Sequence, residues 1–135
     1  MQQLLFALGL MLFLLGLLTG LAIPFLRNPR MGVASHLQGV SNGPFLVLTG
    51  LLWPHLHLWR AAELTVVVLL AYGAYANWLA TQLGSVWGAG RRFAPIASGV
   101  HHATAAQERI VDGLLVTVAP AMIGATVLLI VGVLR

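Results

Sequence analysis

The sequence predicts an all-α integral membrane protein, a compact four-helix bundle that forms a single domain over residues 1–135. Composition is the first reason: 59% of the residues are hydrophobic and only 7% are charged, whereas a soluble domain carries about 25% charged residues. The second reason is the presence of four apolar runs, each close to the roughly 20 residues that cross a bilayer as a helix. These runs lack the alternation of a β-barrel strand.

The four spans are expected at about residues 4–26, 33–54, 61–83 and 104–134. The first has no basic region before it and is expected to be a retained helix rather than a cleaved signal. The fourth is expected to begin at Thr104, because Thr104 and Gln107 have the spacing of a capping box. Three pairs of small residues, each four positions apart, predict where helices pack closely: Gly16 and Gly20, Gly39 and Gly43, and Ala121 and Ala125.

Charge predicts the orientation. All seven basic residues are arginines, against three acidic residues, which gives a formal net charge of +4. The arginines flank apolar runs singly or in pairs, which is typical of membrane boundaries and argues against nucleic-acid binding. Loops 27–35 and 84–109 hold most of them. These two loops are therefore expected in the cytoplasm of a bacterial-type inner membrane, with both termini outside.

Several kinds of chemistry are excluded by what the sequence lacks. The chain has no cysteine, which excludes disulfides, iron–sulfur clusters and thiolate ligands. It has no nucleotide-binding loop, zinc-protease motif or nucleophile elbow. A bound metal would therefore depend on histidine, carboxylate or amide ligands.

His36 is the leading candidate for a functional residue. A polar ring at the mouth of a lipid-buried helix is costly and is usually retained for function. Gly39, Val40 and Gly43 share its helical face, and this strip predicts room for a flat group such as a porphyrin bound through the imidazole. Asn42 lies about 120° around the helix, so it cannot share a metal shell with His36. It is expected on a neighbouring wall of the same pocket, hydrogen-bonded to a substrate.

Further polar residues are expected at the same depth of the membrane. Tyr72, Tyr75, Asn77 and Thr81 lie in the half of the third span that is antiparallel to the start of the second. Glu108 and Asp112 begin the fourth span on that side. This convergence indicates a site.

Each of these residues also has a structural interpretation. His36 would then only reach the membrane interface, the asparagines would join helices, and the tyrosines would pack or anchor. Glu108 and Asp112 share a helical face, where like charges are unfavourable unless one of them pairs with Arg109 or Arg92. His101 and His102 are expected in the solvated loop.

Four motifs closely resemble the hydroxylaminobenzene mutases over essentially the whole chain. They are Asn28-Pro29-Arg30-Met31-Gly32, His36-x5-Asn42-Gly43, Tyr75-Ala76-Asn77-Trp78-Leu79-Ala80 and Trp87-Gly88-Ala89-Gly90. The resemblance implies a membrane isomerase that converts hydroxylaminobenzene to 2-aminophenol during nitroaromatic degradation.

More distantly, the chain is similar to styrene oxide isomerase, which also has four membrane helices and a His-x5-Asn-Gly segment. That resemblance implies a homotrimer with haem b between protomers, His36 as the iron ligand, and Asn42 and Asn77 at the substrate. The substrate-binding tyrosine of that family falls on Thr81, so whether Thr81, Tyr72 or Tyr75 takes its role is open.

The two resemblances together imply a mutase in which ferric haem b acts as a Lewis acid. Asn42 and Asn77 would orient the arylhydroxylamine, with Tyr72 and Tyr75 as further catalytic candidates and His36, Gly39 and Gly43 binding the cofactor. The alternatives are a haem-dependent epoxide isomerase and a non-catalytic haem-binding or structural bundle.

Overall fold

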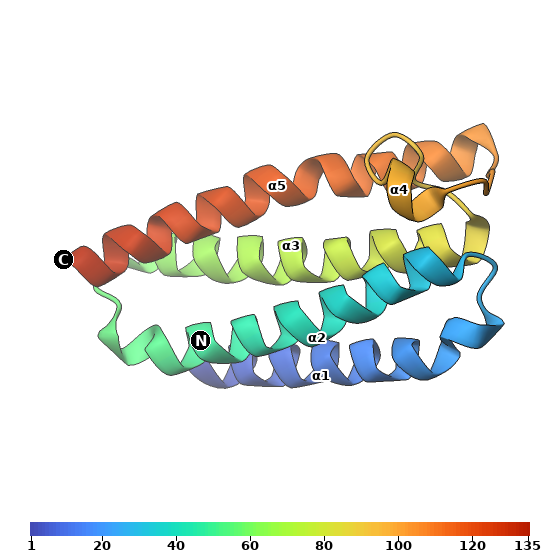
Figure 1. Cartoon of the computed structure of the whole chain (residues 1–135). Coiled ribbons are helices and arrows are strands. Elements are labelled where there is room, and N and C mark those ends of the chain that lie inside the picture. The colour runs from blue at the N-terminus through green and yellow to red at the C-terminus, as the bar shows by residue number, and fades with distance from the viewer.

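The computed structural model describes residues 1–135, all of them in helices, turns or loops. Four long helices run side by side, each antiparallel to the next along the chain (Figure 1). They are α1 (Gln2–Ala22), α2 (Pro29–Leu52), α3 (Arg60–Trp87) and α5 (Ala105–Leu134). Three short helices lie between them: η1 (Ile23–Phe25), η2 (Trp53–His55) and α4 (Pro95–Ser98). The predicted all-α class is confirmed.

Local capping explains where the helices begin and end. The Thr104 hydroxyl accepts the Gln107 backbone N–H at 3.3 Å, and the Gln107 side chain accepts the Thr104 N–H, which confirms the predicted capping box. α2 begins at residue 29 rather than near 33, because Asn28 caps it and a proline stands at its first position. α3 continues to residue 87 and ends where Gly88 adopts a φ of +76°.

Three of the long helices are long and apolar enough to cross a membrane: α1 with η1, α3 and α5. The chain is therefore a membrane protein. α2 has a comparable length but is less apolar, because Ser35, His36, Gln38, Ser41 and Asn42 interrupt its hydrophobic residues. A fourth transmembrane pass through α2 stays a prediction.

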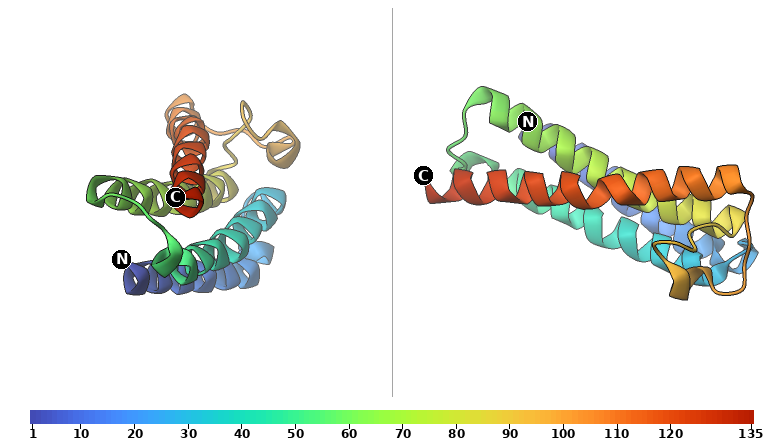
Figure 2. Two further views of the ribbon diagram at one scale, coloured as in Figure 1. Left: turned by 90° about the vertical axis from the view of Figure 1, so that its left-hand side faces the viewer. Right: turned by 90° about the horizontal axis from the view of Figure 1, so that it is seen from above.

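Three of the long helices pack together and the fourth is peripheral. α1 packs on α2, α3 contacts both of them, and α5 packs on α3. Viewed along the helices, α5 lies far from α1, with α3 between them (Figure 2, left). Within the predicted helical bundle, α5 therefore packs on α3 through one face and leaves its other faces open. Ala121 and Ala125 are buried, whereas Ile123, Val127 and Ile130 are exposed.

The closest helix packing joins α1 to α2. A Cβ atom added to Gly39 would lie 2.4 Å from the Gly16 Cα, and one added to Gly43 would lie 2.7 Å from the Gly9 carbonyl oxygen. Glycine lets the two backbones approach this closely. The prediction that these small residues mark helix contacts is therefore confirmed for Gly16, Gly39 and Gly43.

Asn28 connects the start of α2 to α4. Its side chain is fully buried, its oxygen accepts the Met31 N–H at 3.2 Å, and its NH2 group donates to the carbonyls of Ala97 and Ser98 at 3.0 and 3.3 Å. One amide thus caps a helix and holds the long loop.

Asn28→Asp and Asn28→Ala are expected to separate these two roles. Aspartate keeps the cap but places a buried carboxylate oxygen against the Ala97 and Ser98 carbonyls, so limited proteolysis should cut residues 88–104 faster and the thermal midpoint should fall. Alanine loses the donors without this repulsion and also loses the cap, whose removal costs about 1 kcal/mol. Equal proteolysis of Asn28→Asp and the unmodified chain would contradict the anchoring role.

Candidate functional site

His36 lies on the face of α2 that packs against α1. Its Nδ1 is 2.8 Å from the Gly16 carbonyl oxygen, and its ring rests where Gly20 lacks a side chain: a Cβ atom there would be 2.8 Å from Nδ1. A carbonyl oxygen only accepts, so Nδ1 carries the proton of this hydrogen bond. Nε2 has no partner within the chain and is not fully buried. His36 therefore presents one fixed, accessible nitrogen to a ligand.

Gly39 and Gly43 do not leave the open strip that the sequence suggested. Both are buried, and the space beside their Cα atoms is filled by the backbone of α1. The expectation that they provide room for a flat cofactor is wrong within one chain, because this face of α2 is consumed by close helix packing. Any flat group that binds the imidazole must approach from the exposed side of the ring.

Asn42 and Asn77 come together around a third amide, Gln38. The Asn77 NH2 group donates to Gln38 Oε1 at 2.7 Å, and the Asn42 NH2 group donates to the same oxygen at 3.2 Å. This carboxamide cluster joins α2 to α3. Sequence reasoning paired the two asparagines by depth but did not use Gln38, although its spacing of four residues before Asn42 places both on one helical face.

His36 and the carboxamide cluster face different neighbours of α2. The imidazole contacts α1, whereas the cluster contacts α3. Two residues of helix turn a side chain by about 200°, so His36 and Gln38 project from nearly opposite sides of α2. Asn42 is therefore not on a wall shared with His36 inside one chain.

The two tyrosines connect α3 to different helices. The Tyr72 hydroxyl is 2.6 Å from the Thr117 hydroxyl on α5, and the Tyr75 hydroxyl donates to the Leu8 carbonyl on α1 at 2.8 Å. Thr81 is buried and bonds to carbonyls of its own helix. None of the three hydrogen-bonds to a side-chain amide of the carboxamide cluster, although the Thr81 hydroxyl donates to the Asn77 backbone carbonyl at 2.9 Å.

A second polar network lies closer to the loop end and was also missed from the sequence. Gln82 on α3 accepts hydrogen bonds through Oε1 from Ser35 on α2 at 2.9 Å and from Thr19 on α1 at 3.3 Å. The Trp78 indole N–H donates to the Thr19 hydroxyl at 3.2 Å. Ser35 and Thr19 are buried, so this network holds three helices together and has no group free for a ligand at those positions.

Glu108 anchors the loop that follows α3. Its Oε2 accepts the backbone N–H groups of Gly90 at 2.9 Å and Arg91 at 3.3 Å. Neither the Glu108 nor the Asp112 carboxylate forms an ion pair with Arg109 or Arg92: the Arg109 guanidinium donates to the Ala105 carbonyl, and that of Arg92 lies over the Phe93 ring. One oxygen of Glu108 and one of Asp112 are buried without a partner.

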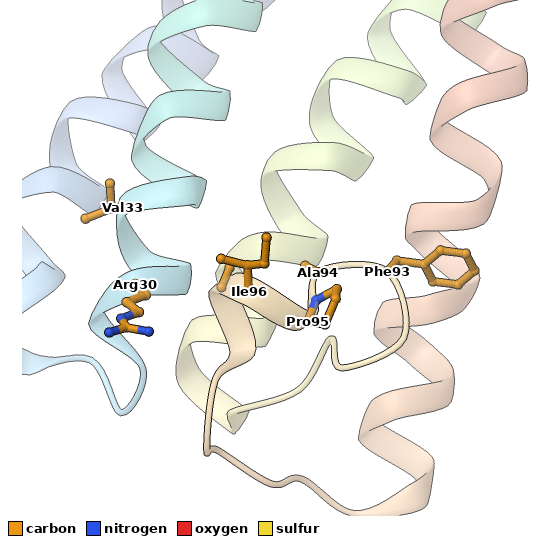
Figure 3. A pocket seen from close by; sticks show the side chains of 7 residues that line it. Arg30, Val33, Phe93, Ala94, Pro95 and Ile96 are labelled. Atoms are coloured by element: carbon orange, nitrogen blue, oxygen red, sulfur yellow. The ribbon is translucent and has the colours of Figure 1, made fainter.

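A surface hollow of about 550 Å³ lies away from these residues. It lies beside α4, where Arg30 and Val33 of α2 face Ile96 and Pro95 across the opening (Figure 3). Its lining is mostly apolar and includes exposed Phe93. No side chain of the predicted site lines it, so it is separate from the imidazole and the carboxamide cluster.

Comparison with known proteins places the whole chain among isomerases. The sequence model of a family described as styrene oxide isomerase matches residues 1–134. Hydroxylaminobenzene mutase HabA of Ectopseudomonas oleovorans is 56% identical over 135 residues, covering 100% of both chains. Hydroxylaminobenzene mutase HabB of the same organism is 51% identical over 116 residues, covering 86% of this chain and 71% of HabB. No solved structure matches.

Proposed function

The chain belongs to the styrene oxide isomerase family and is an isomerase, and we propose that it is a membrane-bound mutase that converts hydroxylaminobenzene to 2-aminophenol. The observation that carries this proposal is the 56% identity to hydroxylaminobenzene mutase HabA without a gap in coverage at either end. The resemblance drawn from the motifs is confirmed by these relatives.

We also propose that His36 holds haem b. A histidine that binds a metal through one nitrogen commonly donates the other N–H to a carbonyl, which fixes the ring and its tautomer. The Nδ1 contact with the Gly16 carbonyl has this form, and Nε2 is accessible and unpaired. The residues present therefore fit the group. Haem iron bound there would supply a Lewis acid for the hydroxylamine oxygen.

The opposite directions of His36 and the carboxamide cluster favour a site assembled from two copies of the chain. One arylhydroxylamine cannot contact both sides of α2 in a single protomer. In a closed oligomer, however, the exposed side of the His36 ring of one copy can meet the carboxamide cluster of the next. The exposed apolar residues of α5 are also consistent with burial in lipid or against a neighbour. We propose a homotrimer with the haem between protomers.

The reaction moves oxygen from nitrogen to carbon within one molecule. The N–O bond breaks, a C–O bond forms at the ortho ring carbon, that carbon loses a proton, and the nitrogen gains one, so substrate and product are isomers. We propose that the side-chain oxygens of Asn42 and Asn77, which have no partner in the chain, accept hydrogen bonds from the substrate and orient the ring. Apolar helix surfaces around the site keep water from attacking the para carbon.

The membrane setting suits this substrate. An arylhydroxylamine is small and largely apolar, so it partitions into lipid and reaches a site between helices directly. The loops at the arginine-rich end, residues 27–35 and 84–109, are proposed to face the cytoplasm of an inner membrane. His36 and the carboxamide cluster would then lie in the cytoplasmic half of the bilayer.

The test is turnover by the purified protein in detergent or lipid. We expect hydroxylaminobenzene to yield mainly 2-aminophenol, measured by chromatography, with styrene oxide converted far more slowly. Conversion of styrene oxide alone would indicate an epoxide isomerase, the reaction named by the family description. Turnover of neither compound would leave a non-catalytic bundle and refute the proposal.

A further inference from the structure

We infer that Gln38 is a positioning residue that sets the direction of both asparagine amides, and that this direction selects substrates carrying N–H or O–H donors. The inference rests on the proposed mutase function and deepens it, because it names the property of the substrate that the carboxamide cluster recognises.

The hydrogen bonds of the cluster carry the argument. Gln38 Oε1 accepts from the NH2 groups of Asn77 and Asn42 at 2.7 and 3.2 Å. A carbonyl oxygen has two lone pairs and can serve both donors. With their NH2 groups turned toward Gln38, both asparagines direct their oxygens away from it. Neither Asn42 Oδ1 nor Asn77 Oδ1 has a partner in the chain, and neither is fully buried.

The free side-chain oxygens of Asn42 and Asn77 distinguish substrates by hydrogen-bond type. Hydroxylaminobenzene has an N–H and an O–H and can donate to both oxygens. An epoxide has no donor, so it would leave both oxygens unpaired, and a site that loses its hydrogen-bond partners discriminates strongly against such a molecule. If the asparagine amides were reversed, their NH2 groups would face the substrate and the preference would favour the epoxide.

Gln38 is the group that decides between these two arrangements. An asparagine amide can turn over by rotation about one bond, and only its hydrogen-bond partners hold it in one direction. The side chains of Asn42 and Asn77 form no other hydrogen bond within the chain. Removing the Gln38 oxygen would free both amides while leaving the two asparagines in place.

Three variants test this role. Gln38→Met keeps the side-chain length but removes the acceptor. Gln38→Glu keeps an acceptor for both NH2 groups and so preserves their direction. Gln82→Met is the matched control, because Gln82 also joins helices through one accepting oxygen, at 2.9 and 3.3 Å from its donors, but does not touch the asparagines.

We expect Gln38→Met to lower kcat for hydroxylaminobenzene by roughly 10- to 100-fold, as misplaced orienting groups do, and to raise the share of 4-aminophenol. Gln38→Glu should recover most of the rate and the 2-aminophenol share. Gln82→Met should lower the thermal midpoint without changing the product ratio. Equal product ratios and equal kcat in the two methionine variants would overturn the inference, as would a Gln38→Glu variant no better than Gln38→Met.

A binding measurement separates failure of this inference from failure of the proposed function. Calorimetry with benzyl alcohol, which has an O–H donor, and with benzyl methyl ether, which has only an acceptor, needs no turnover and adds no amine ligand for iron. We expect the unmodified chain and Gln82→Met to bind the alcohol more tightly than the ether, and Gln38→Met to lose that preference. A preference that persists in Gln38→Met refutes the inference even if the chain is a mutase. Absent turnover with the expected binding pattern would refute only the proposed reaction.

Discussion

Replacing His36 with alanine is expected to remove haem from the purified protein and to lower turnover of hydroxylaminobenzene by more than about 100-fold, since even the loss of a residue that only orients a metal ligand costs 10- to 100-fold. The reason is the single free nitrogen of the ring. Nδ1 is committed to the Gly16 carbonyl at 2.8 Å, so Nε2 is the atom that would bind iron.

Absorption spectra measure this loss directly. The unmodified protein should show a Soret band and a pyridine haemochrome spectrum of haem b, and His36→Ala should show neither. Adding imidazole to His36→Ala should restore part of the band, because the cavity beside Gly20 that receives the ring would remain. His102→Ala is the control, since His102 is exposed in the loop and its removal should change neither spectrum nor rate.

Two results would contradict this account of His36. Retention of the Soret band and of turnover in His36→Ala would exclude the residue as a ligand. Turnover by an unmodified protein without any haem would refute the haem proposal and leave the carboxamide cluster as the leading catalytic group. Circular dichroism should show equal helicity in both proteins, so that unfolding does not explain the loss.

Much of the fold was predictable because its causes are local. Composition predicted a membrane protein, the Thr104–Gln107 pattern predicted the start of α5, and glycines four residues apart predicted close packing. The peripheral position of α5 was not predictable in the same way. Small residues on α5 indicate one contact face, but the sequence does not say that α3 alone would occupy it.

The candidate site was likewise predictable only in part from the sequence. The depth of His36, Asn42 and Asn77 followed from counting residues along antiparallel spans. Their neighbours did not, because a helical wheel gives the angle between side chains but not which helix lies at each angle. The face of α2 that carries His36 and Gly39 packs against α1, and the opposite face contacts α3. The sequence does not single out Gln38, because a lone glutamine in a helix is compatible with many structural roles. Its role depends on a contact with α3 that no local pattern encodes.

α2 therefore has two faces with different roles, one packed against α1 and the other against α3. On the α1 side, close backbone packing fixes the His36 ring against the Gly16 carbonyl. On the α3 side, packing is looser and amide groups meet with free oxygens. A substitution that pushes α1 away from α2 should therefore also displace the His36 ring. Such a substitution can show whether a glycine on this face packs the two helices or contacts the cofactor directly.

Gly39→Ala is expected to destabilise the protein strongly, whereas Gly113→Ala is not. The new methyl group at residue 39 would lie 2.4 Å from the Gly16 Cα. This obstacle is backbone, so no side-chain rotation relieves it and the helices must move apart. Overpacking of this kind costs about 1–3 kcal/mol and sometimes more. Nothing lies within 4 Å of a Cβ atom at Gly113, so alanine there should be neutral or stabilise α5 by up to about 1 kcal/mol.

Thermal unfolding followed by circular dichroism, with haem content measured at each temperature, distinguishes the two roles of Gly39. If the glycine serves packing, Gly39→Ala lowers the midpoint, and haem is lost together with helicity. If Gly39 instead lines the cofactor site, as the sequence predicted, Gly39→Ala leaves the thermal midpoint of the haem-free protein unchanged and lowers only its affinity for haem. The 2.4 Å approach to Gly16 leads us to expect the first result, because the space beside Gly39 is already filled by α1.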